Sequence, residues 1–532
     1  MGRSEMTDAA RRDDARPRIF DVATTGTVLA DRAVDELPPP EGPRSALERL
    51  QSVLPSDRLA GWVTTMVVGL LAGVLRLWSV DYPHAKIFDE VYYPPNAQQL
   101  LQQGYESSPG RLYVVHPPLG KWCIAAGIKL FGDNTVGWRV PSGVAGAIAV
   151  VILVRVVRRM SGSTMIGGIA GLLLAIDGLS VVMSRTSLLD IFIQVFVVAG
   201  FACLVVDRDQ VRSRLAEAVA ATPEEPFRSR VAIGPRPWRL AAGVLLGASC
   251  GVKWSGVYFL AGFAIMSVLW DRGALRTAGV RRPALTTALR DLPAALWTLG
   301  VMPVIAYLAT WTGWFLGENG YDRHWAETHP SAHFGFVPGA LRSLWHYHHE
   351  MLSFHEGLGS YHPYRSQPWS WLVDGRPVDF YYPDTHTLHG CGQSQCVRQV
   401  LAIGTPALWW AFVPMILWML WLLVSRRDWR AGAVLMAFAA GWGAWLENTG
   451  RTMFFFYMIP LVPFMAMGVA FALGDLLGRA NAWTTRRLVG LVLVAGYLAL
   501  VVADFVYLWP ILTAQKITLT AWQHRMWFGS WI

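Results

Sequence analysis

The stretch WVTTMVVGLLAGVLRLWSV, at Trp62–Val80, decides the class of this protein. Arg76 is its only charged residue. A helix needs roughly 20 mostly apolar residues to cross the hydrocarbon core of a bilayer. Because lipid offers no hydrogen bonds to an exposed backbone, such a stretch is predicted to cross the membrane as a helix.

The rest of the chain repeats this pattern. It is 53% hydrophobic and only 16% charged, whereas soluble domains carry about 25% charged residues. We predict an all-α polytopic membrane protein with about eleven spans. The ten further windows are Trp138–Val154, Met165–Met183, Leu188–Val206, Leu240–Trp254, Ser255–Trp270, Pro293–Trp314, Thr405–Val424, Ala431–Leu446, Met453–Leu473 and Leu488–Tyr507.

Basic residues gather in alternate loops, which is typical of loops that stay in the cytoplasm. This alternation predicts a cytoplasmic N-terminus and an extracytoplasmic C-terminus. It also argues against nucleic-acid binding as the reason for the net charge of +9, because such proteins collect their charge on one soluble surface. Residues 1–58 are polar and are predicted to be a disordered cytoplasmic tail, with one membrane domain over 59–532.

Two predicted outer loops are too long and too aromatic to be spacers. They cover residues 81–137 and 316–404. Loops of this length without regular structure are usually functional or disordered, and an aromatic composition disfavours disorder. We therefore expect the chemistry of the protein at the outer face of the membrane.

Asp89 and Glu90 follow the first predicted span closely. A poorly solvated carboxylate has a raised pKa and can act as a general base. The alternative is a pair of solvated acids at the membrane boundary. We assign both residues as catalytic candidates.

Several basic and polar residues also fall near predicted outer span ends. Lys121 and Arg185 are candidates for binding a phosphate head group. Lys253 lies near the end of its own span, where a charge is costly and by default suggests function. The alternatives are a lysine that anchors a helix and structural ion pairs. His116, Lys121, Arg185, Asp190 and Lys253 are therefore candidate substrate-binding residues.

The second outer loop combines aromatic and polar side chains that suit sugars or an interfacial helix. Its candidates are His362 and Trp371, and Arg451 follows further along the chain. The histidines show no H-E-x-x-H spacing, so we favour structural or substrate contacts over a metal. Cys391 and Cys396 could form a disulfide or hold zinc with His386 and His389.

The chain has no P-loop and no G-x-G-x-x-G motif, which gives a cytoplasmic nucleotide substrate little support. A donor carried by a membrane lipid fits the outer candidates better.

Taken in order, these motifs resemble the protein O-mannosyltransferase family in its actinobacterial form. They are Asp89-Glu90, the His116–Lys121 segment HPPLGK, Ser184-Arg185 through Asp190, Val252-Lys253-Trp254, His362-Pro363-Tyr364 through Trp371, Arg376-Pro377 with Tyr381-Tyr382, and the Arg451–Tyr457 segment RTMFFFY.

The resemblance implies a GT-C fold and inverting transfer of mannose from polyprenyl-phosphate-mannose to Ser or Thr hydroxyls of exported proteins. It implies that Asp89 is the catalytic carboxylate, that Arg185 and Lys253 face the lipid phosphate, and that neither a cofactor nor a metal is needed. It also implies a cell-membrane location and unfolded acceptors delivered by the secretion translocon.

The sequence departs from eukaryotic members because 316–404 is too short for their inserted MIR domain. Two other functions stay open. One is a GT-C transferase with a glycolipid or cell-wall glycan acceptor. The other is a transporter, which would show internal repeats and broken helices.

Overall fold

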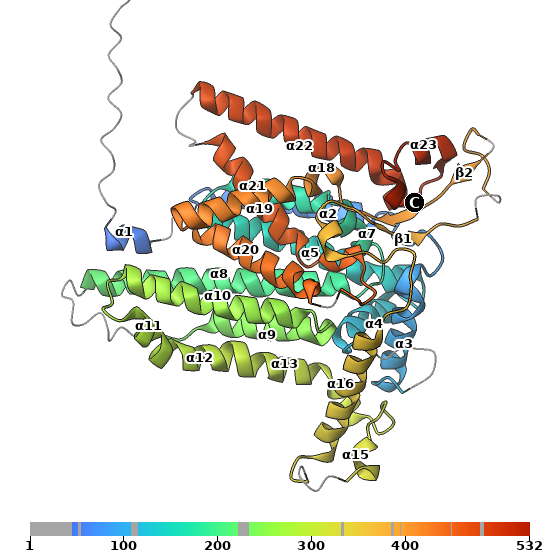
Figure 1. Ribbon diagram of the computed structural model, residues 1–532, viewed down its shortest axis with the longest axis horizontal. Coiled ribbons are helices and arrows are strands. Elements are labelled where there is room, and N and C mark those ends of the chain that lie inside the picture. Colours follow the sequence, from blue (N-terminus) through green and yellow to red (C-terminus); the bar gives the residue numbers. More distant parts are fainter. Residues whose placement is uncertain are drawn as a thin grey trace, which may run out of the picture. The chain divides into compact units, whose positions relative to one another are not determined.

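The structure is a computed structural model that describes residues 45–51, 55–107, 115–221, 234–330, 335–384, 388–393, 395–447, 449–478 and 484–532. Helices dominate this part of the chain (Figure 1). They include α2 (Arg58–Leu77), α5 (Thr135–Ser161), α8 (Asp190–Ala221), α9 (Pro237–Val252), α10 (Gly256–Thr277), α13 (Met302–Thr310), α16 (Gly339–Gly357), α19 (Phe412–Trp421), α20 (Trp429–Trp442), α21 (Val462–Leu477) and α22 (Thr485–Leu512).

Seven helices in the described residues are long and apolar enough to cross a membrane, which confirms a polytopic membrane fold. They are Arg58–Leu77, Thr135–Ser161, Asp190–Ala221, Gly256–Thr277, Pro283–Thr310, Pro406–Arg426 and Thr485–Leu512. An eighth span is possible if α6 (Thr164–Ala175) and α7 (Gly178–Ser184), which meet at a 63° bend, count as one. The predicted number of eleven is not confirmed.

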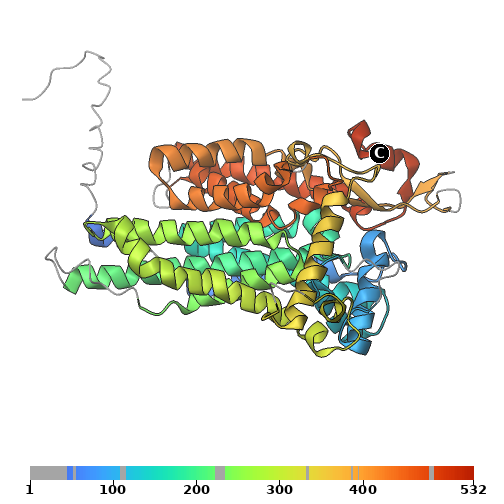
Figure 2. The same cartoon turned by 60° about the horizontal axis from the view of Figure 1, so that its bottom comes forward.

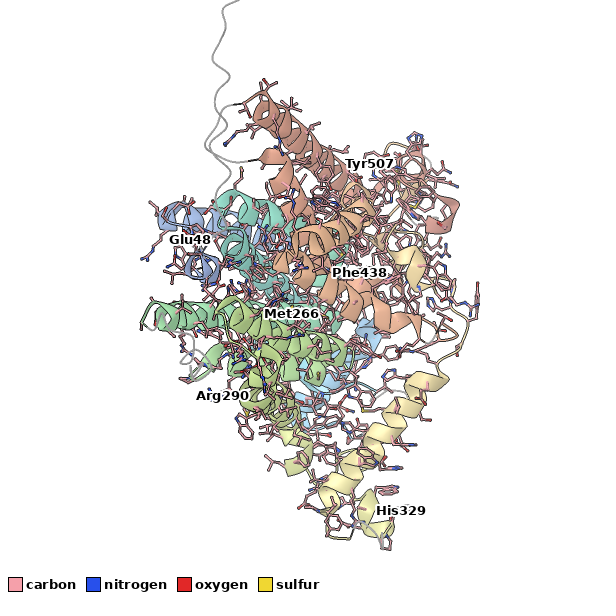
Figure 3. The ribbon with its side chains drawn as sticks, turned by 60° about the vertical axis from the view of Figure 1, so that its left-hand side comes forward. Glu48, Met266, Arg290, His329, Phe438 and Tyr507 are labelled. Carbon is pink, nitrogen blue, oxygen red and sulfur yellow. A yellow bond between two sulfur atoms is a disulfide. The ribbon has the colours of Figure 1, made fainter. Side chains whose placement is uncertain are left out.

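Three predicted spans form shorter helices, namely α9, α20 and α21, of 16, 14 and 16 residues. Their packing still places them inside the helical body. α9 lies against both α8 and α13, and α20 and α21 lie against each other. Figure 3 shows Met266 of α10 in this interior, while Tyr507 lies on α22.

Two predicted boundaries differ from the helix bounds in the structure. The basic segment after Val206 is not a loop at its start, because α8 continues to Ala221. Part of the predicted tail is also ordered, since Ala46–Leu50 forms the short helix α1 and Leu50 packs against Val211 and Leu275. Residues 1–44 lie outside the described residues.

The predicted outer loops fold into short elements that build the site. The first contains η1 (Phe88–Val91), α3 (Tyr93–Gln103) and α4 (Leu119–Phe131). The second contains α15 (Trp325–Thr328), α16, α17 (Pro368–Trp371) and the strands β1 (Val378–Tyr381), β2 (Cys396–Val397) and β3 (Val400–Ala402). Figures 1 and 2 both show α16 running steeply across the ends of α9, α10 and α13.

Two small antiparallel sheets connect segments of this region. β1 pairs with β3, with Val378 opposite Ala402. β2 pairs with β4 (Ile517–Thr518) near the C-terminus. Cys391 and Cys396 are joined in a disulfide beside the second sheet, so these two sulfurs are not available for zinc. His386 of the alternative zinc site lies outside the described residues.

Candidate active site

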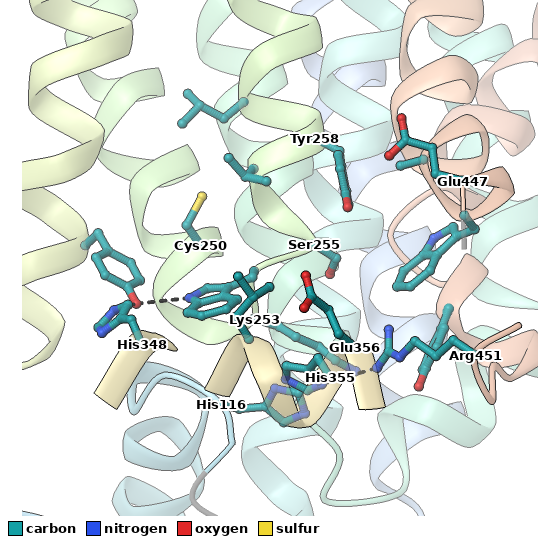
Figure 4. A pocket seen from close by; sticks show the side chains of 18 of the residues that line it. His116, Cys250, Lys253, Ser255, Tyr258, His348, His355, Glu356, Glu447 and Arg451 are labelled. Atoms are coloured by element: carbon teal, nitrogen blue, oxygen red, sulfur yellow. Dashed lines mark hydrogen bonds between the residues drawn. The ribbon is translucent and has the colours of Figure 1, made fainter. Parts of the chain in front are cut away.

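A cavity of about 650 Å³ opens where α16 crosses the ends of α9, α10 and α13. Its polar part is lined by Lys253, His116, His355, Glu356 and Arg451 (Figure 4). Its apolar part is lined by Val257 and Leu260 of α10, Pro303 and Val304 of α13, and Leu352 of α16. The cavity therefore joins a charged pocket, which holds the cations Lys253 and Arg451 as well as carboxylates, to an apolar wall made by two membrane helices.

Lys253 is placed by the break between α9 and α10. The chain is extended at this residue, which ends α9. Its ammonium group lies 3.0 and 3.1 Å from the two carboxylate oxygens of Asp190 and 4.8 Å from the centre of the Tyr457 ring. The structure thus brings together the predicted residues Lys253 and Asp190, and holds the cation at the cavity wall.

Asp89 lies beside this cation, in the short helix η1. Its side chain is partly buried. Burial raises the pKa of the Asp89 carboxyl to about 6, while the charge of Lys253 acts against this rise and the charge of Asp190 adds to it. A carboxyl with this pKa is largely ionised at neutral pH yet remains a useful proton acceptor. Its environment therefore suits a general base.

Glu90 has a different environment, although it is adjacent in sequence. Its carboxylate accepts two hydrogen bonds from Arg139, at 2.7 and 2.8 Å, and both side chains are fully buried. It also accepts hydrogen bonds from the backbone N–H groups of Ser187 and Ile87. Since these four bonds occupy both oxygens, the geometry favours a positioning role for Glu90 over proton transfer.

Arg139 connects the loop after α2 to η1, and sequence reasoning missed it. Besides Glu90, its guanidinium donates to the carbonyl groups of Val80, Asp81, Pro83 and Ala85. It lies at the outer end of its predicted span, where positive charge is not the rule. An arginine at this end of a predicted span was the feature of the sequence that could have identified Arg139.

His116 lies in the cavity wall through its ring, which stacks on His355 with centroids 5.0 Å apart. His355 donates from Nε2 to the carbonyl of Val115 and accepts at Nδ1 from Arg451. Burial lowers the pKa of His355 to about 4, and burial also holds the pKa of His116 well below its usual value. Both rings are therefore neutral at pH 7 and leave Lys253 and Arg451 as the lining cations.

Three other predicted residues lie near the cavity or near Asp89 but do not line the cavity. Lys121 is fully buried and bonds to Glu106 at 2.7 and 2.9 Å and to the carbonyl of His116. Trp371 is buried behind the wall, with its ring 6.3 Å from that of Tyr457. His362 packs edge-on against Phe88, next to Asp89. These contacts indicate supporting roles.

Arg185 is not brought to this cavity. Its guanidinium donates to the carbonyl groups of Leu75, Arg76, Trp78 and Ser79, where α2 ends. It lines a second cavity instead. Arg185 and Lys253, both expected to face the lipid phosphate, therefore line different cavities, and the second cation that lines the cavity of Lys253 is Arg451.

Only one group of described residues has the composition and spacing of a metal site: Asp322, His346 and Glu350, whose ligand atoms lie within 4.8 Å of one another. None of the three lines the cavity that contains Lys253. Sequence reasoning also passed over three residues that line the cavity, namely Tyr457, which ends the segment RTMFFFY, and the carboxylates Glu356 and Glu447.

The chain is similar to known proteins along most of its length. Residues 66–312 match the family model of dolichyl-phosphate-mannose-protein mannosyltransferase, and residues 340–473 match the C-terminal four TMM region of protein-O-mannosyltransferase. The polyprenol-phosphate-mannose–protein mannosyltransferase of Mycobacterium tuberculosis is 44% identical, covering 90% of this chain and 93% of that protein. The protein of the same name from Corynebacterium glutamicum is 35% identical, covering 93% and 96%.

The fold is similar to that in the Saccharomyces cerevisiae protein O-mannosyltransferase Pmt1–Pmt2 complex bound to the sugar donor. The TM-score is 0.68 at 15% identity, with 90% of this chain and 95% of that chain covered. This likeness confirms the predicted GT-C membrane fold. With two matching family models and relatives that align along most of its length, the chain belongs to the protein O-mannosyltransferase family.

Proposed function

We propose that this protein transfers mannose from polyprenyl-phosphate-mannose to Ser and Thr hydroxyls of exported proteins, with inversion at the sugar carbon. The observation that carries the proposal is a single cavity in which Lys253 and Arg451 adjoin an apolar wall, with Asp89 beside Lys253. The relatives named for this activity support protein acceptors over a glycolipid or cell-wall glycan.

The apolar wall suits the prenyl chain of the donor. Val257 and Val304 are 47% and 56% exposed and belong to helices that qualify as membrane spans. Because these residues face outward from the protein, a lipid chain could reach the cavity from the bilayer without crossing water. Lys253 and Arg451 would then bind the phosphate, since cations at the departing group stabilise its charge.

The reaction needs few groups. An acceptor hydroxyl becomes a good nucleophile when a base removes its proton. Asp89 would take that proton, the hydroxyl oxygen would attack the sugar carbon, and the bond to the phosphate oxygen would break. One displacement gives inversion and forms no covalent enzyme intermediate. His116 and His355, both neutral, would contact uncharged parts of the substrates.

We place the enzyme in the cytoplasmic membrane with its N-terminus inside and its C-terminus outside. The basic loops predicted from the sequence support this orientation. Asp89 and the cavity would then face the exterior, where acceptors arrive unfolded. Delivery by the secretion translocon is part of this proposal.

The direct test uses membranes containing the protein, radiolabelled polyprenyl-phosphate-mannose and a Thr-rich peptide. We expect label on the peptide that is released by β-elimination, and none on a matched peptide with Ala in place of Thr. Label that enters only the lipid or glycan fraction would contradict a protein acceptor.

A further inference from the structure

A second cavity, of about 470 Å³, lies at the ends of α2 and α22. Its lining includes Trp78 and Ser79 after α2, Trp509 and Lys516 at the end of α22, and Arg398 from the outer loop. None of these residues lines the first cavity. It is therefore a separate site, and its position follows from the ends of two candidate membrane spans.

The lining of this cavity is strongly cationic. Among the described residues it holds Arg185, Arg398 and Lys516 against a single carboxylate, Asp81. The Oδ2 atom of Asp81 lies 3.5 Å from Nδ1 of His84, and the Asp81 side chain is 42% exposed. With histidine counted as neutral, the lining carries two net positive charges, because Asp81 is the one carboxylate among the described residues that line the cavity.

Arg398 has donor capacity that the protein does not use. It donates to the Tyr82 hydroxyl and lies over the Tyr82 ring. Its Nε atom is buried and has no hydrogen-bond partner. A buried donor without a partner costs free energy unless a ligand or water supplies an acceptor. The guanidinium is also the group best matched to phosphate oxygens.

The surroundings of the cavity favour a ligand that comes from a membrane. Trp78 is 72% exposed just after the last turn of α2, where tryptophan is favoured at the level of lipid head groups. Val74 of α2 and Val506 of α22 are also exposed, at 49% and 62%. These apolar surfaces lead away from the cavity along two spans, as acyl chains would.

We propose that this second cavity binds the phosphate of an anionic membrane lipid, with Arg398 and Lys516 as its main ligands. Arg185 contributes charge from the cavity wall, but its donors to α2 also stabilise the end of that helix. This site is independent of mannose transfer, because none of its basic residues lines the donor cavity.

The test measures binding of phosphatidylglycerol to the purified full chain by native mass spectrometry, with phosphatidylcholine as the neutral lipid. We expect the double variant Arg398→Gln/Lys516→Gln to bind phosphatidylglycerol more weakly, by about fivefold for each charge removed. Asp81→Asn should bind it more tightly. Binding of phosphatidylcholine should not change.

The matched control is Lys86→Gln/Lys129→Gln, which removes two exposed charges outside both cavities. Its affinity for phosphatidylglycerol should equal that of the wild type. Mannosyl transfer in detergent by Arg398→Gln/Lys516→Gln should remain, which shows that this variant folds. Equal lipid binding by that variant and the control would overturn the proposal. If inorganic phosphate bound this cavity as tightly as phosphatidylglycerol does, the ligand would be a free anion and the lipid assignment would be overturned.

Discussion

Arg139 and Glu90 form a two-point ion pair with N–O distances of 2.7 and 2.8 Å, and neither side chain is exposed to solvent. The pair joins the start of α5 to the residue next to Asp89. Arg139 also donates to the carbonyl groups of Val80, Pro83 and Ala85. The pair therefore anchors the whole segment between α2 and α3. The carboxyl that we assign as the base is thus held by its neighbour.

This pair predicts a stability defect. Glu90→Gln or Arg139→Ala leaves one buried charge without its partner, which typically costs about 3–5 kcal/mol. We expect a clearly lower thermal midpoint in detergent and little folded protein. Asp89→Asn, which breaks no ion pair among the described residues, serves as the matched control and should melt near the wild type. A Glu90→Gln protein of normal stability would remove the anchoring role.

The raised pKa of Asp89 predicts the acid side of the pH profile. A base must be deprotonated to act, so kcat/KM for the acceptor should fall as the pH drops through about 6. Burial raises this pKa above its unfolded value, so the protonated carboxyl favours the folded state at low pH, and this contribution to stability is lost as the pH rises through about 6. Single-turnover rates across this range give the apparent pKa. A flat profile down to pH 4.5 would exclude Asp89 as the titrating group.

Lys253 and Arg451 should control use of the donor. Charge-assisted hydrogen bonds contribute about 1.5–3 kcal/mol. Lys253→Ala should therefore lower kcat/KM for polyprenyl-phosphate-mannose by roughly 10- to 100-fold. Arg451→Gln should also lower kcat/KM for this donor. Lys129→Ala, at an exposed position on α4, is the control. Unchanged donor dependence in both cavity variants would place the phosphate elsewhere.

Lys121 should behave as a structural residue rather than a ligand. Burial raises the pKa of its partner Glu106, while the ammonium of Lys121 acts against this rise. Lys121→Met should lower thermal stability, whereas the double variant Lys121→Met/Glu106→Gln should recover part of the loss because no unpaired charge remains. The KM for donor should stay the same in any variant that folds. A selective rise in that KM would restore the predicted role in substrate binding.

The sequence allowed the membrane fold and part of the site to be predicted. Long apolar windows and charges near their ends are local features, so α2, α5, α8 and α22 were identified, as were Asp89 and Lys253 as candidates. The predicted ends of the helices were less accurate than the predicted spans themselves. α8 runs past its apolar window because residues such as Arg, Leu, Ala and Glu after Val206 also favour helix.

The partners of buried charges could not be predicted. Glu90 meets Arg139 across 49 positions, and Arg185 meets carbonyl groups more than 100 positions earlier. Only the packing of α2, α5 and α7 brings these groups together. A charged residue at a span end therefore has the same local sequence signature whether it binds substrate, as proposed for Lys253, or holds the fold, as Arg139 does.

The most direct test of the account compares Asp89→Asn with the wild type in the peptide transfer assay. The control is Asp133→Asn, an exposed carboxyl in the same outer loop. We predict that Asp89→Asn is produced in the membrane at normal levels and still binds the lipid donor. It should lose at least 99% of transfer, roughly the 10²-fold or more that general-base catalysis contributes, while Asp133→Asn keeps full activity. Transfer by Asp89→Asn at the wild-type rate would contradict the assignment of Asp89 as the catalytic base.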